Sequence, residues 1–502
     1  MSRHHRIHPS IIAIASLLVS LLASTPAAAT PTPQLWLVAA APAVTIERYP
    51  GEQVDLDLGT NIVAGSKPFE IHVKRASYHD PIVATQIVRR GQTRTLPAGL
   101  VRDFSGFSRF LHLTITNAAG RTVVDRDQGF CPNGWEPMRT RPDVPPTSPY
   151  PQLCDTNPFT LGSVWGLQAG WAVNTAMSGF QNRIDVDRLL DGTYTAKLEV
   201  NQPYRQLFGV PSAQASATVK VTIRTRTDGG AGAASATPRT TASAAQASSS
   251  RAAPQPAPRP TTGRARVPAR FRPDLRPLPA WAISVIGPEE AGGPATGPQQ
   301  YLAFNANVWN AGPSPLVVDG FRRPGTLLMD AYQYFFDTSG RQVGWAPTGT
   351  LEFDTRDGHE HWHFTDFARY RLLTATMQEA VRSQKEAFCI APTDGIDLTV
   401  RGANWKPFIT DLHTACGTAS AIAIRETLDT GWGDTYTQFL PGQSFDITGV
   451  PNGTYYIEIV ANPDHRLYEG NTSNNVSLRK VILGGTRGNR TVTVPPYEDI
   501  DA

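Results

Sequence analysis

The chain has 502 residues, four cysteines and a formal net charge of +3 at neutral pH. This length allows about two or three domains, each large enough to bury an apolar core. The small net charge, with no basic patch interleaved with aromatic residues, argues against a nucleic-acid partner.

Residues 1–29 have the parts of a secretory signal peptide. A basic start precedes an apolar run from Ile11 to Ala23, and an Ala-x-Ala cleavage site ends at Ala29. That run is too short to span a bilayer, and no later stretch approaches the ~20 apolar residues of a transmembrane helix. We therefore expect a secreted mature chain without a membrane anchor.

Both halves of the chain read as β structure. Only 375–386 (Ala375 to Glu386) has a helical pattern, and turn pairs such as Asp191-Gly192 separate the other segments. The sequence therefore predicts an all-β fold with a β-sandwich-like domain in each half. Alternation of apolar and polar residues predicts strands over 54–58 (Val54 to Leu58), 69–73, 110–115, 193–200, 302–308, 454–460 and 476–482.

A change of composition divides the two halves. Residues 225–270 are rich in Ala, Ser, Thr, Pro and Arg and offer no apolar face, so we expect a disordered linker. It separates a domain over 31–224 from a second domain over 271–486, which is followed by a tail over 487–502.

The four cysteines fall into two close pairs, Cys131 with Cys154 and Cys389 with Cys416. Export places them in an oxidising compartment, where such pairs are usually disulfides. Each would close a loop worth ~3 kcal/mol by the chain-entropy estimate. A tetrathiolate metal site is disfavoured because neither pair has C-x-x-C spacing.

One short segment carries three of the eleven histidines, His359, His361 and His363. Successive side chains of a strand alternate between faces, so the three imidazoles would share one face. Imidazole binds copper, zinc, iron or nickel, and three ligands leave a position open for water or substrate. A His-rich surface strand or a stacked core strand is the alternative. The strict spacing of three histidines favours a metal site.

A comparison of the chain with itself reveals a tandem duplication at an offset of about 260 residues. Where the second half has its three histidines, the first half has Gly99, Val101 and Asp103, which cannot rebuild the site. The first half is therefore a degenerate copy. Matching segments are 104–110 with 364–370, 129–131 with 387–389, 170–171 with 431–432, 184–186 with 445–447, and 192–194 with 453–455.

The second half resembles the catalytic domain of the lysyl oxidase family over roughly residues 272–485. The motifs that carry the resemblance follow the histidine cluster in order: Phe364 to Tyr370, Lys385 to Cys389, Asp434-Thr435-Tyr436, Phe445 to Thr448 and Asn452 to Tyr455. Members of this family are copper-dependent amine oxidases.

The resemblance implies a role for each of these residues. His359, His361 and His363 would bind copper, while Lys385 and Tyr436 would be cross-linked as the cofactor lysine tyrosylquinone. The first half has Asp127 opposite Lys385 and Thr175 opposite Tyr436, so it could not form this cofactor.

The implied reaction also needs a base to remove a proton from the substrate. A carboxylate of raised pKa would serve. By sequence the nearest candidates are Asp434 and Asp366, and either could instead cap a turn.

The resemblance further implies a calcium site, because the family joins an Asp-Leu pair to an acidic and Asn-rich run. Carboxylate and amide oxygens suit this cation. Asn471 stands where the family has an acid, which should weaken binding, and an Asn-rich turn is the alternative. The matching residues are Asp274, Leu275, Glu469, Asn471, Asn474 and Asn475.

Together these features predict a secreted amine oxidase. It would convert primary amines, as peptidyl lysine of a protein substrate or as small amines, to aldehydes with O2, releasing H2O2 and ammonia. One alternative is a non-catalytic secreted β-sandwich protein of the cell envelope that binds copper and calcium. Another is an iron or zinc enzyme with the same three histidines.

Overall fold

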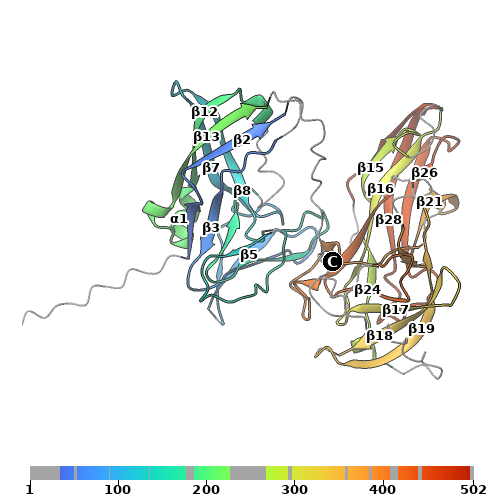
Figure 1. The fold of residues 1–502 in the computed structure, drawn as a ribbon. Helices are drawn as coiled ribbons and strands as arrows, with labels where there is room; N and C mark the ends of the chain where they lie inside the picture. The colour runs from blue at the N-terminus through green and yellow to red at the C-terminus, as the bar shows by residue number, and fades with distance from the viewer. Residues whose placement is uncertain are drawn as a thin grey trace, which may run out of the picture. The chain divides into compact units, whose positions relative to one another are not determined.

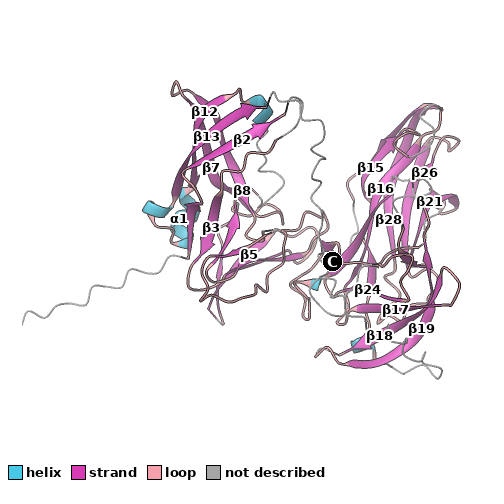
Figure 2. Ribbon diagram, in the orientation of Figure 1, coloured by secondary structure: helices cyan, strands magenta, loops and turns pink. Residues whose placement is uncertain are grey.

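The computed structural model describes residues 34–49, 54–89, 91–134, 136–176, 186–226, 267–291, 297–337, 339–356, 360–383, 387–407, 416–438 and 444–497. Strands make up nearly all of the regular structure in these ranges, and helices are few and short (Figure 2). The all-β class predicted from the sequence is confirmed.

The first half forms three sheets, whose strands run from blue to green in Figure 1. One sheet has the order β1 (Leu35–Ala39), β3 (Thr60–Ala64), β11 (Trp171–Asn174), β9 (Met138–Arg139). The second has the order β10 (Gly162–Leu167), β4 (Phe69–Lys74), β5 (Val83–Arg89), β6 (Gln92–Thr95). The third has the order β2 (Ala43–Arg48), β13 (Ser216–Thr225), β12 (Gly192–Val200), β7 (Phe107–Asn117), β8 (Thr122–Phe130).

The second half also forms three sheets, drawn from yellow to red in Figure 1. One has the order β14 (Leu275–Pro277), β16 (Tyr301–Asn310), β25 (Trp432–Gln438), β23 (Asp394–Gly395), and β15 (Trp281–Ile286) and β26 (Phe445–Asp446) also pair with β16. The next has the order β20 (Trp362–Phe364), β19 (Gln342–Phe353), β18 (Leu328–Phe336), β17 (Leu316–Arg322), β24 (Ala423–Leu428). The last has the order β22 (Glu379–Arg382), β21 (Ala368–Thr374), β27 (Gly453–Ala461), β28 (Val476–Thr486), β29 (Asn489–Thr493).

These sheet orders correspond strand for strand, which supports the duplication seen in the sequence. The sheet β1-β3-β11-β9 matches β14-β16-β25-β23, and β10-β4-β5-β6 matches β24-β17-β18-β19, to which β20 is added. In the third sheet β8-β7-β12-β13 matches β22-β21-β27-β28. Only the outermost strand differs there, because β2 pairs parallel with β13 whereas β29 pairs antiparallel with β28.

Alternating side chains build the core of each half. In β12, Tyr194, Ala196 and Leu198 are buried while the residues between them face outward. In β27, the equivalent Tyr455, Ile457 and Ile459 are buried. This period of two places one face of each strand against the core, as the sequence pattern predicts.

The prediction of a helix over 375–386 is wrong. The chain turns near Met377, whose φ of 61° is left-handed, and returns as β22. Leu372 pairs with Val381 across this hairpin. Most of the segment is exposed and has no apolar stripe that could hold a helix against a sheet, so pairing with β21 prevails.

Two other elements depart from the expectation. The strand expected over 54–58 has only an isolated bridge position at Asp55, although Leu56 and Leu58 are buried. A helix that the sequence analysis did not identify, α1 (Gln202–Phe208), ends at Gly209, whose φ of 62° is left-handed. Pro in its first turn and Gly at its end are the usual signals of such a helix. In the described ranges, short 3₁₀ helices cover Val186–Arg188, Ser212–Gln214 and Ala269–Phe271.

Both predicted disulfides are present. Cys131 bonds to Cys154 and Cys389 bonds to Cys416, with Cα–Cα separations of 5.9 and 5.8 Å. Within the described residues, no helix is both long and apolar enough to cross a bilayer. The predicted signal peptide and most of the predicted linker lie outside the described residues, so the domain boundaries stay predictions.

Candidate metal and tyrosine site

The strand that carries His363 is buried between two neighbouring segments. β20 pairs antiparallel with β19 on one side. On the other side Phe364 and Phe388 exchange both backbone hydrogen bonds, at 2.7 and 3.0 Å. The Trp362 N–H also donates to the Cys416 carbonyl at 2.9 Å, so the disulfide segment helps to hold the strand. Trp362, His363 and Phe364 are almost fully buried as a result.

His361 and His363 turn their imidazoles toward one another, as the strand spacing predicts. Their Nε2 atoms are 2.9 Å apart, and their ring planes are nearly perpendicular at 82°. A metal ion about 2.0–2.1 Å from each nitrogen would see these two ligands about a right angle apart. The pair therefore fits a shared metal ion of the kind that imidazole prefers.

A carboxylate lies behind His363, on the side away from His361. Asp354 Oδ2 is 3.6 Å from the His363 Nδ1 atom. Partial burial acts to raise the pKa of Asp354, but hydrogen bonds from Arg356 and its positive charge hold that pKa far below the usual value. The charged Asp354 favours a proton on Nδ1, which leaves the Nε2 lone pair free for a metal.

Two of the predicted site residues, His359 and Lys385, lie outside the described residues. Among the residues that are described, no group of three or more His, Cys, Asp or Glu side chains is arranged to hold a metal. The third imidazole ligand and the position of the lysine therefore stay predictions.

Tyr436 lies against the segment that follows Lys385 in the sequence. Its hydroxyl donates to the Cys389 carbonyl at 2.6 Å, and its ring meets the Phe388 ring edge to face at 4.4 Å. Because Phe388 is paired with Phe364 of the histidine strand, one short segment connects the tyrosine to the imidazoles. β25 holds the tyrosine in place by pairing Tyr436 with Ala306 of β16.

The surroundings of Tyr436 disfavour its ionised form. Burial raises the pKa of the Tyr436 hydroxyl well above its usual value, and the neighbouring Asp434, Glu426 and Tyr370 raise it further. A phenol in this position stays protonated unless a positive charge such as a metal ion, or a proton acceptor, is brought to it.

The two candidate bases have different environments. Asp434 is buried on the same strand as Tyr436 and accepts a long hydrogen bond from the Ala391 amide at 3.4 Å. Asp366 lies in the turn after β20, with a left-handed φ of 60°, and forms an ion pair with Arg466 at 3.2 Å. Asp434 is therefore the acid that the structure brings to the tyrosine, whereas Asp366 has the contacts of a turn residue.

A third acid, Glu426, was missed by the sequence analysis. It is fully buried on β24 and accepts the Ile390 N–H at 3.1 Å, while its Oε1 atom has no hydrogen-bond partner among the residues that the structure describes. Burial raises the pKa of Glu426 well above its usual value, and the charge of Asp434 adds to that effect. The available signal was an acid between the apolar residues Ile424 and Leu428, which identifies no partner by itself.

Five of the six residues predicted to bind calcium lie together. Glu469 accepts the Leu275 N–H and the Asn475 side-chain amide, both at 2.8 Å, and Asp274 accepts the Asn474 amide at 3.0 Å. Within the described part of the chain, the buried Oδ1 atoms of Asn474 and Asn475 have no hydrogen-bond partner. Two acids beside two unpartnered amide oxygens fit a hard cation.

The sixth calcium candidate, Asn471, has local contacts of its own. Its side-chain oxygen accepts hydrogen bonds from the backbone N–H and the hydroxyl of Ser473, at 3.0 and 2.8 Å. This is the geometry of a turn that an Asn side chain stabilises. A ligand role for Asn471 stays a prediction.

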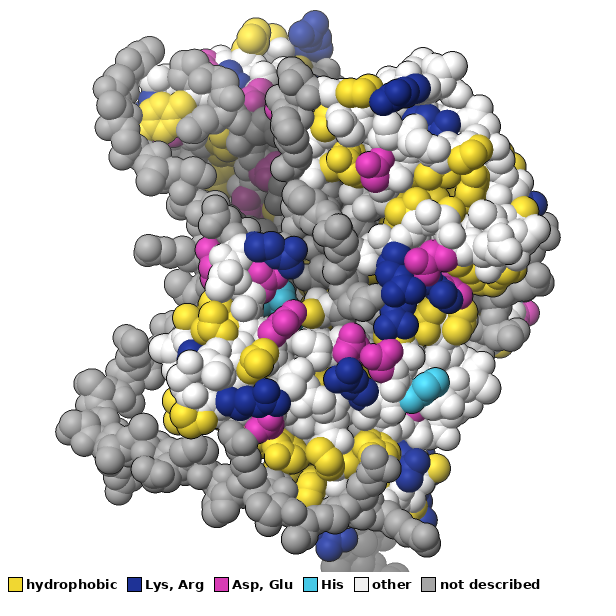
Figure 3. Space-filling model, turned by 90° about the vertical axis from the view of Figure 1, so that its right-hand side faces the viewer, with side chains coloured by type: hydrophobic (Ala, Val, Ile, Leu, Met, Phe, Trp, Pro, Cys, Tyr) yellow, Lys and Arg dark blue, Asp and Glu magenta, His cyan; other side chains and the backbone are white. Residues whose placement is uncertain are grey.

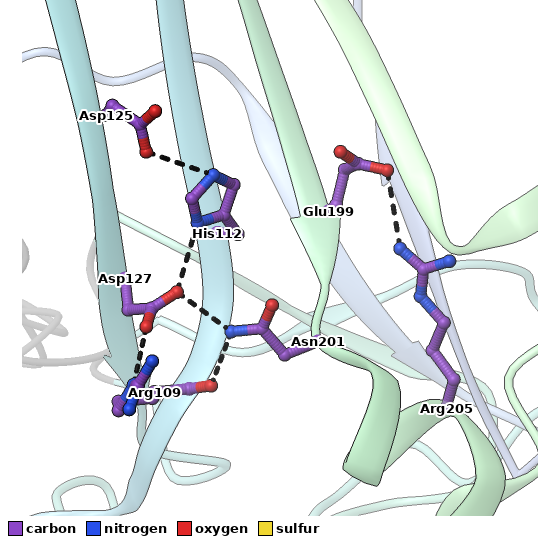
Figure 4. Close-up of polar contacts among 7 residues, drawn as sticks. All are labelled: Arg109, His112, Asp125, Asp127, Glu199, Asn201 and Arg205. Atoms are coloured by element: carbon purple, nitrogen blue, oxygen red, sulfur yellow. Dashed lines mark hydrogen bonds and ion pairs between the residues drawn. The ribbon is translucent and has the colours of Figure 1, made fainter.

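The corresponding positions of the first half hold different chemistry. Asp127, aligned with Lys385, is bound by His112 at 3.0 Å, by Asn201 at 3.1 Å and by Arg109 (Figure 4). Thr175, aligned with Tyr436, is buried with its hydroxyl 2.6 Å from that of Thr60. These residues satisfy one another and leave no free ligand for a metal.

The face of the molecule drawn in Figure 3 mixes acidic and basic side chains. Ion pairs such as Arg369 with Asp464 at 3.1 Å and Arg382 with Glu379 at 3.0 Å are typical of the second half. Charge on this face would therefore not by itself select an anionic or a cationic partner.

Fold and site together define an all-β protein with a candidate imidazole metal centre beside a partly buried tyrosine. Residues 343–491 match the sequence model of the lysyl oxidase family. The chain is 29% identical over 142 residues to protein-lysine 6-oxidase of Sus scrofa, a match that covers 28% of this chain and 51% of that protein. It is 31% identical over 120 residues to lysyl oxidase homolog 1 of Homo sapiens, covering 24% of this chain and 18% of that protein.

These matches show that part of the second half, residues 343–491, is similar to the lysyl oxidase family. The chain spans about half or less of the curated relatives that it matches. The resemblance seen in the motifs of the sequence is confirmed at the level of the family.

Proposed function

We propose that the protein is a secreted copper-dependent amine oxidase whose active site lies in the second half of the chain. The single observation that carries the proposal is the connection of three elements through one segment. The imidazole of His361, just before β20, meets that of His363 on β20. Phe364 of the same strand pairs with Phe388, and Phe388 and Cys389 contact Tyr436. Lys385 precedes this segment by three residues of sequence.

Each residue has a defined part in this proposal. His361 and His363, with His359, would hold copper, and Asp354 would orient His363 through its other nitrogen. Lys385 and Tyr436 would form lysine tyrosylquinone, which supplies an oxidising carbonyl group when present. The overall reaction converts a primary amine, O2 and water to an aldehyde, ammonia and H2O2.

Amine-dependent H2O2 release from copper-loaded protein tests this proposal. Tyr436→Phe should abolish the release, because phenylalanine cannot become a quinone. Tyr455→Phe is a matched control, since Tyr455 also packs against the core of the second half and also donates to a backbone carbonyl, that of Pro451 at 2.9 Å. Mass mapping should find Lys385 and Tyr436 in one cross-linked peptide. Activity that survives Tyr436→Phe would refute the quinone, and copper binding without turnover would favour a binding protein.

We also propose that Asp274, Glu469, Asn474 and Asn475 bind calcium. The support is the pair of carboxylates beside two unpartnered amide oxygens. Added calcium should raise the unfolding temperature of the wild type and leave that of Glu469→Gln nearly unchanged. An equal rise in both proteins would place the calcium elsewhere.

A further inference from the structure

One peptide group of the second half is held at both of its ends by side chains. The Ile390 N–H donates to Glu426 Oε2 at 3.1 Å, and the Cys389 carbonyl accepts the Tyr436 hydroxyl at 2.6 Å. These two backbone groups belong to one trans peptide unit, so they point in opposite directions from it. Glu426 on β24 and Tyr436 on β25 therefore contact opposite sides of the same peptide group.

The chain on either side of this peptide group is fixed. Phe388 exchanges both backbone hydrogen bonds with Phe364 of β20, Cys389 is part of a disulfide, and the Ile390 side chain is buried. A peptide unit between two fixed residues can still turn about the line that joins their Cα atoms, because only the peptide bond itself is rigid. The hydrogen bond to Glu426 opposes this turning, and it thereby sets the direction of the Cys389 carbonyl.

Keeping an acid at this place costs stability. Glu426 is fully buried, and its Oε1 atom has no hydrogen-bond partner within the described part of the chain. An unsatisfied buried polar group costs about 1–3 kcal/mol. An apolar side chain would fill the same position of β24 without this cost. The packing of the strand therefore does not explain the acid, whereas its hydrogen bond to the peptide group does.

The first half has no acid at the corresponding position. Trp165 precedes Trp171 by the same number of residues as Glu426 precedes the matching Trp432. Trp165 and Glu426 lie on the equivalent strands β10 and β24. An indole ring can donate a hydrogen bond but cannot accept one, so Trp165 could not hold a backbone N–H. Since Trp165 is fully buried, the fold accepts an aromatic side chain at this place.

The other two groups of this arrangement also differ in the first half. The duplicated Phe-Cys pair is followed there by Pro132 in place of Ile390, and proline has no N–H to donate. Thr175, which stands opposite Tyr436, has its hydroxyl 2.6 Å from that of Thr60. The acid, the peptide N–H and the phenol thus occur together in one half and are replaced together in the other, as expected of groups that serve one purpose.

We infer that Glu426 is a positioning residue for Tyr436 and acts through the Cys389–Ile390 peptide group. Its carboxyl oxygen fixes the direction of the Cys389 carbonyl, and that carbonyl holds the Tyr436 hydroxyl, with its proton, in one place. Because hydrogen bonds in series polarise one another, an acceptor at the N–H end also makes the carbonyl oxygen a stronger acceptor. The role rests on the proposed function, since a fixed hydroxyl matters for a tyrosine that reacts.

Two substitutions of Glu426 separate this role from the filling of space. Glu426→Gln keeps an oxygen that can accept the Ile390 N–H, whereas Glu426→Met has a similar length and removes that oxygen. In copper-loaded protein we expect Glu426→Met to lower kcat about 100-fold with little change in KM, because a displacement of about 1 Å at a reacting group costs about that much rate. Glu426→Gln should keep most of the wild-type kcat. Equal values of kcat in the two variants would contradict the positioning role.

Infrared spectroscopy tests the role without copper or turnover. In metal-free protein, a difference spectrum against the same protein carrying Tyr436→Phe isolates the C–O stretch of the Tyr436 phenol, whose frequency depends on the hydrogen bond that the hydroxyl donates. We expect this band at the wild-type frequency in Glu426→Gln and at a shifted frequency in Glu426→Met. An unshifted band in Glu426→Met would overturn the inference. An inactive wild type with the expected shift would overturn the proposed function and leave the positioning role in place.

A change on the donor side guards against misfolding of Glu426→Met. Ile390→Pro removes the N–H that Glu426 binds, and it introduces the residue that the first half has at this position, Pro132. It should shift the phenol band and lower kcat as Glu426→Met does. The double variant should be no worse than either single variant, because both remove the same hydrogen bond. A folded Ile390→Pro protein with the wild-type band would overturn the inference.

Asp429→Asn is the matched control for the loss of a buried acid. Asp429 lies close to Glu426 in the sequence, is also buried, and accepts the Asn404 side-chain amide at 3.1 Å. The substitution should leave the phenol band and kcat unchanged. A shift as large as that of Glu426→Met would show that the band responds to any buried acid, and the inference would fail.

Discussion

The two halves of the chain differ inside strands that otherwise correspond. At equivalent positions of the first half, Trp165 and Val173 fill an apolar interior, whereas the second half has Glu426 and Asp434 there. The first half therefore serves as an internal reference for what the sheets need in order to fold. Side chains that appear only in the second half are the ones to examine for chemistry.

The same comparison applies to the polar residues near each site. In the first half Asp127 is satisfied by Arg109, His112 and Asn201. In the second half Glu426 keeps an unpartnered oxygen in the interior. A satisfied cluster contributes modestly to stability, whereas an unsatisfied one reduces it, so the second half gives up stability at its site.

Removal of a proposed metal ligand should have the largest effect, a loss of copper binding that the matching change in the first half does not cause. His361→Val introduces the residue that the first half has at this position, Val101. Mutation of a residue that only orients a metal ligand typically lowers metal affinity about 10–100-fold. Loss of a ligand itself should lower copper affinity by more than that. Copper content after dialysis measures the effect, and His112→Val in the first half is the control. Equal copper content in the two variants would place the metal elsewhere.

Removal of each disulfide separates stability from function. Replacing both cysteines of either pair with serine should lower the free energy of unfolding by about 3 kcal/mol, because the closed loops are similar in length. Only loss of the Cys389–Cys416 disulfide should also reduce H2O2 release. The backbone carbonyls of these two cysteines accept hydrogen bonds from the Tyr436 hydroxyl and the Trp362 N–H. Denaturant unfolding and activity assays on both variants check this. Loss of H2O2 release in both variants would mean that the loss of activity follows from reduced stability and not from a change at the site.

A change behind the histidines should have an intermediate effect. Asp354→Asn removes the charge that faces His363 Nδ1 at 3.6 Å. Copper affinity should fall about 10–100-fold, as for other residues that orient a metal ligand. Competition with a chelator measures it. Asp330→Asn, which removes an ion pair with Arg323 in the same sheet, should leave affinity unchanged.

Asp127 in the first half should give the smallest effect. Asp127→Asn weakens a partly exposed ion cluster, which is worth about 0.2–1 kcal/mol. Partial burial acts against the charged form, but hydrogen bonds from His112, Asn201 and Arg109 keep the pKa of Asp127 below its usual value. The cluster therefore stabilises the fold above about pH 4, and this contribution is lost as the pH falls through the lowered pKa.

Unfolding temperatures at neutral and acidic pH test that expectation. The wild type should exceed Asp127→Asn slightly at neutral pH, and the gap should close in acid. Amine oxidation should be the same in both proteins. A gap that widens in acid would contradict the lowered pKa.

Features that depend on local spacing could be predicted from the sequence. Strict alternation predicted the strands that became β4, β12 and β27, and it predicted that His361 and His363 share a face. The pairing of the cysteines followed from their closeness in the sequence. These properties are fixed within a few residues, so they need no knowledge of distant partners.

Features decided by distant contacts could not be predicted. β22 pairs with β21 because the edge of that strand, which is itself held by β27, is available to it, and the local pattern of residues does not show this. Glu426 acquires its meaning only where β24 meets β25 and the segment after Lys385. An isolated acid in a strand is ordinarily read as a surface residue, because charged side chains are rarely buried.

The outermost strands of the third sheet determine how each half tolerates truncation. In the first half β2 covers the edge of β13, and in the second half β29 covers the end of β28 from Ile482 to Thr486. Exposed backbone amides at a sheet edge recruit strands from other molecules. β28 already presents Val476, Leu478 and Ile482 to solvent, each at least 39% exposed. Cutting the chain before β29 would therefore favour self-association, even though β20, which carries the proposed metal ligand His363, would be intact.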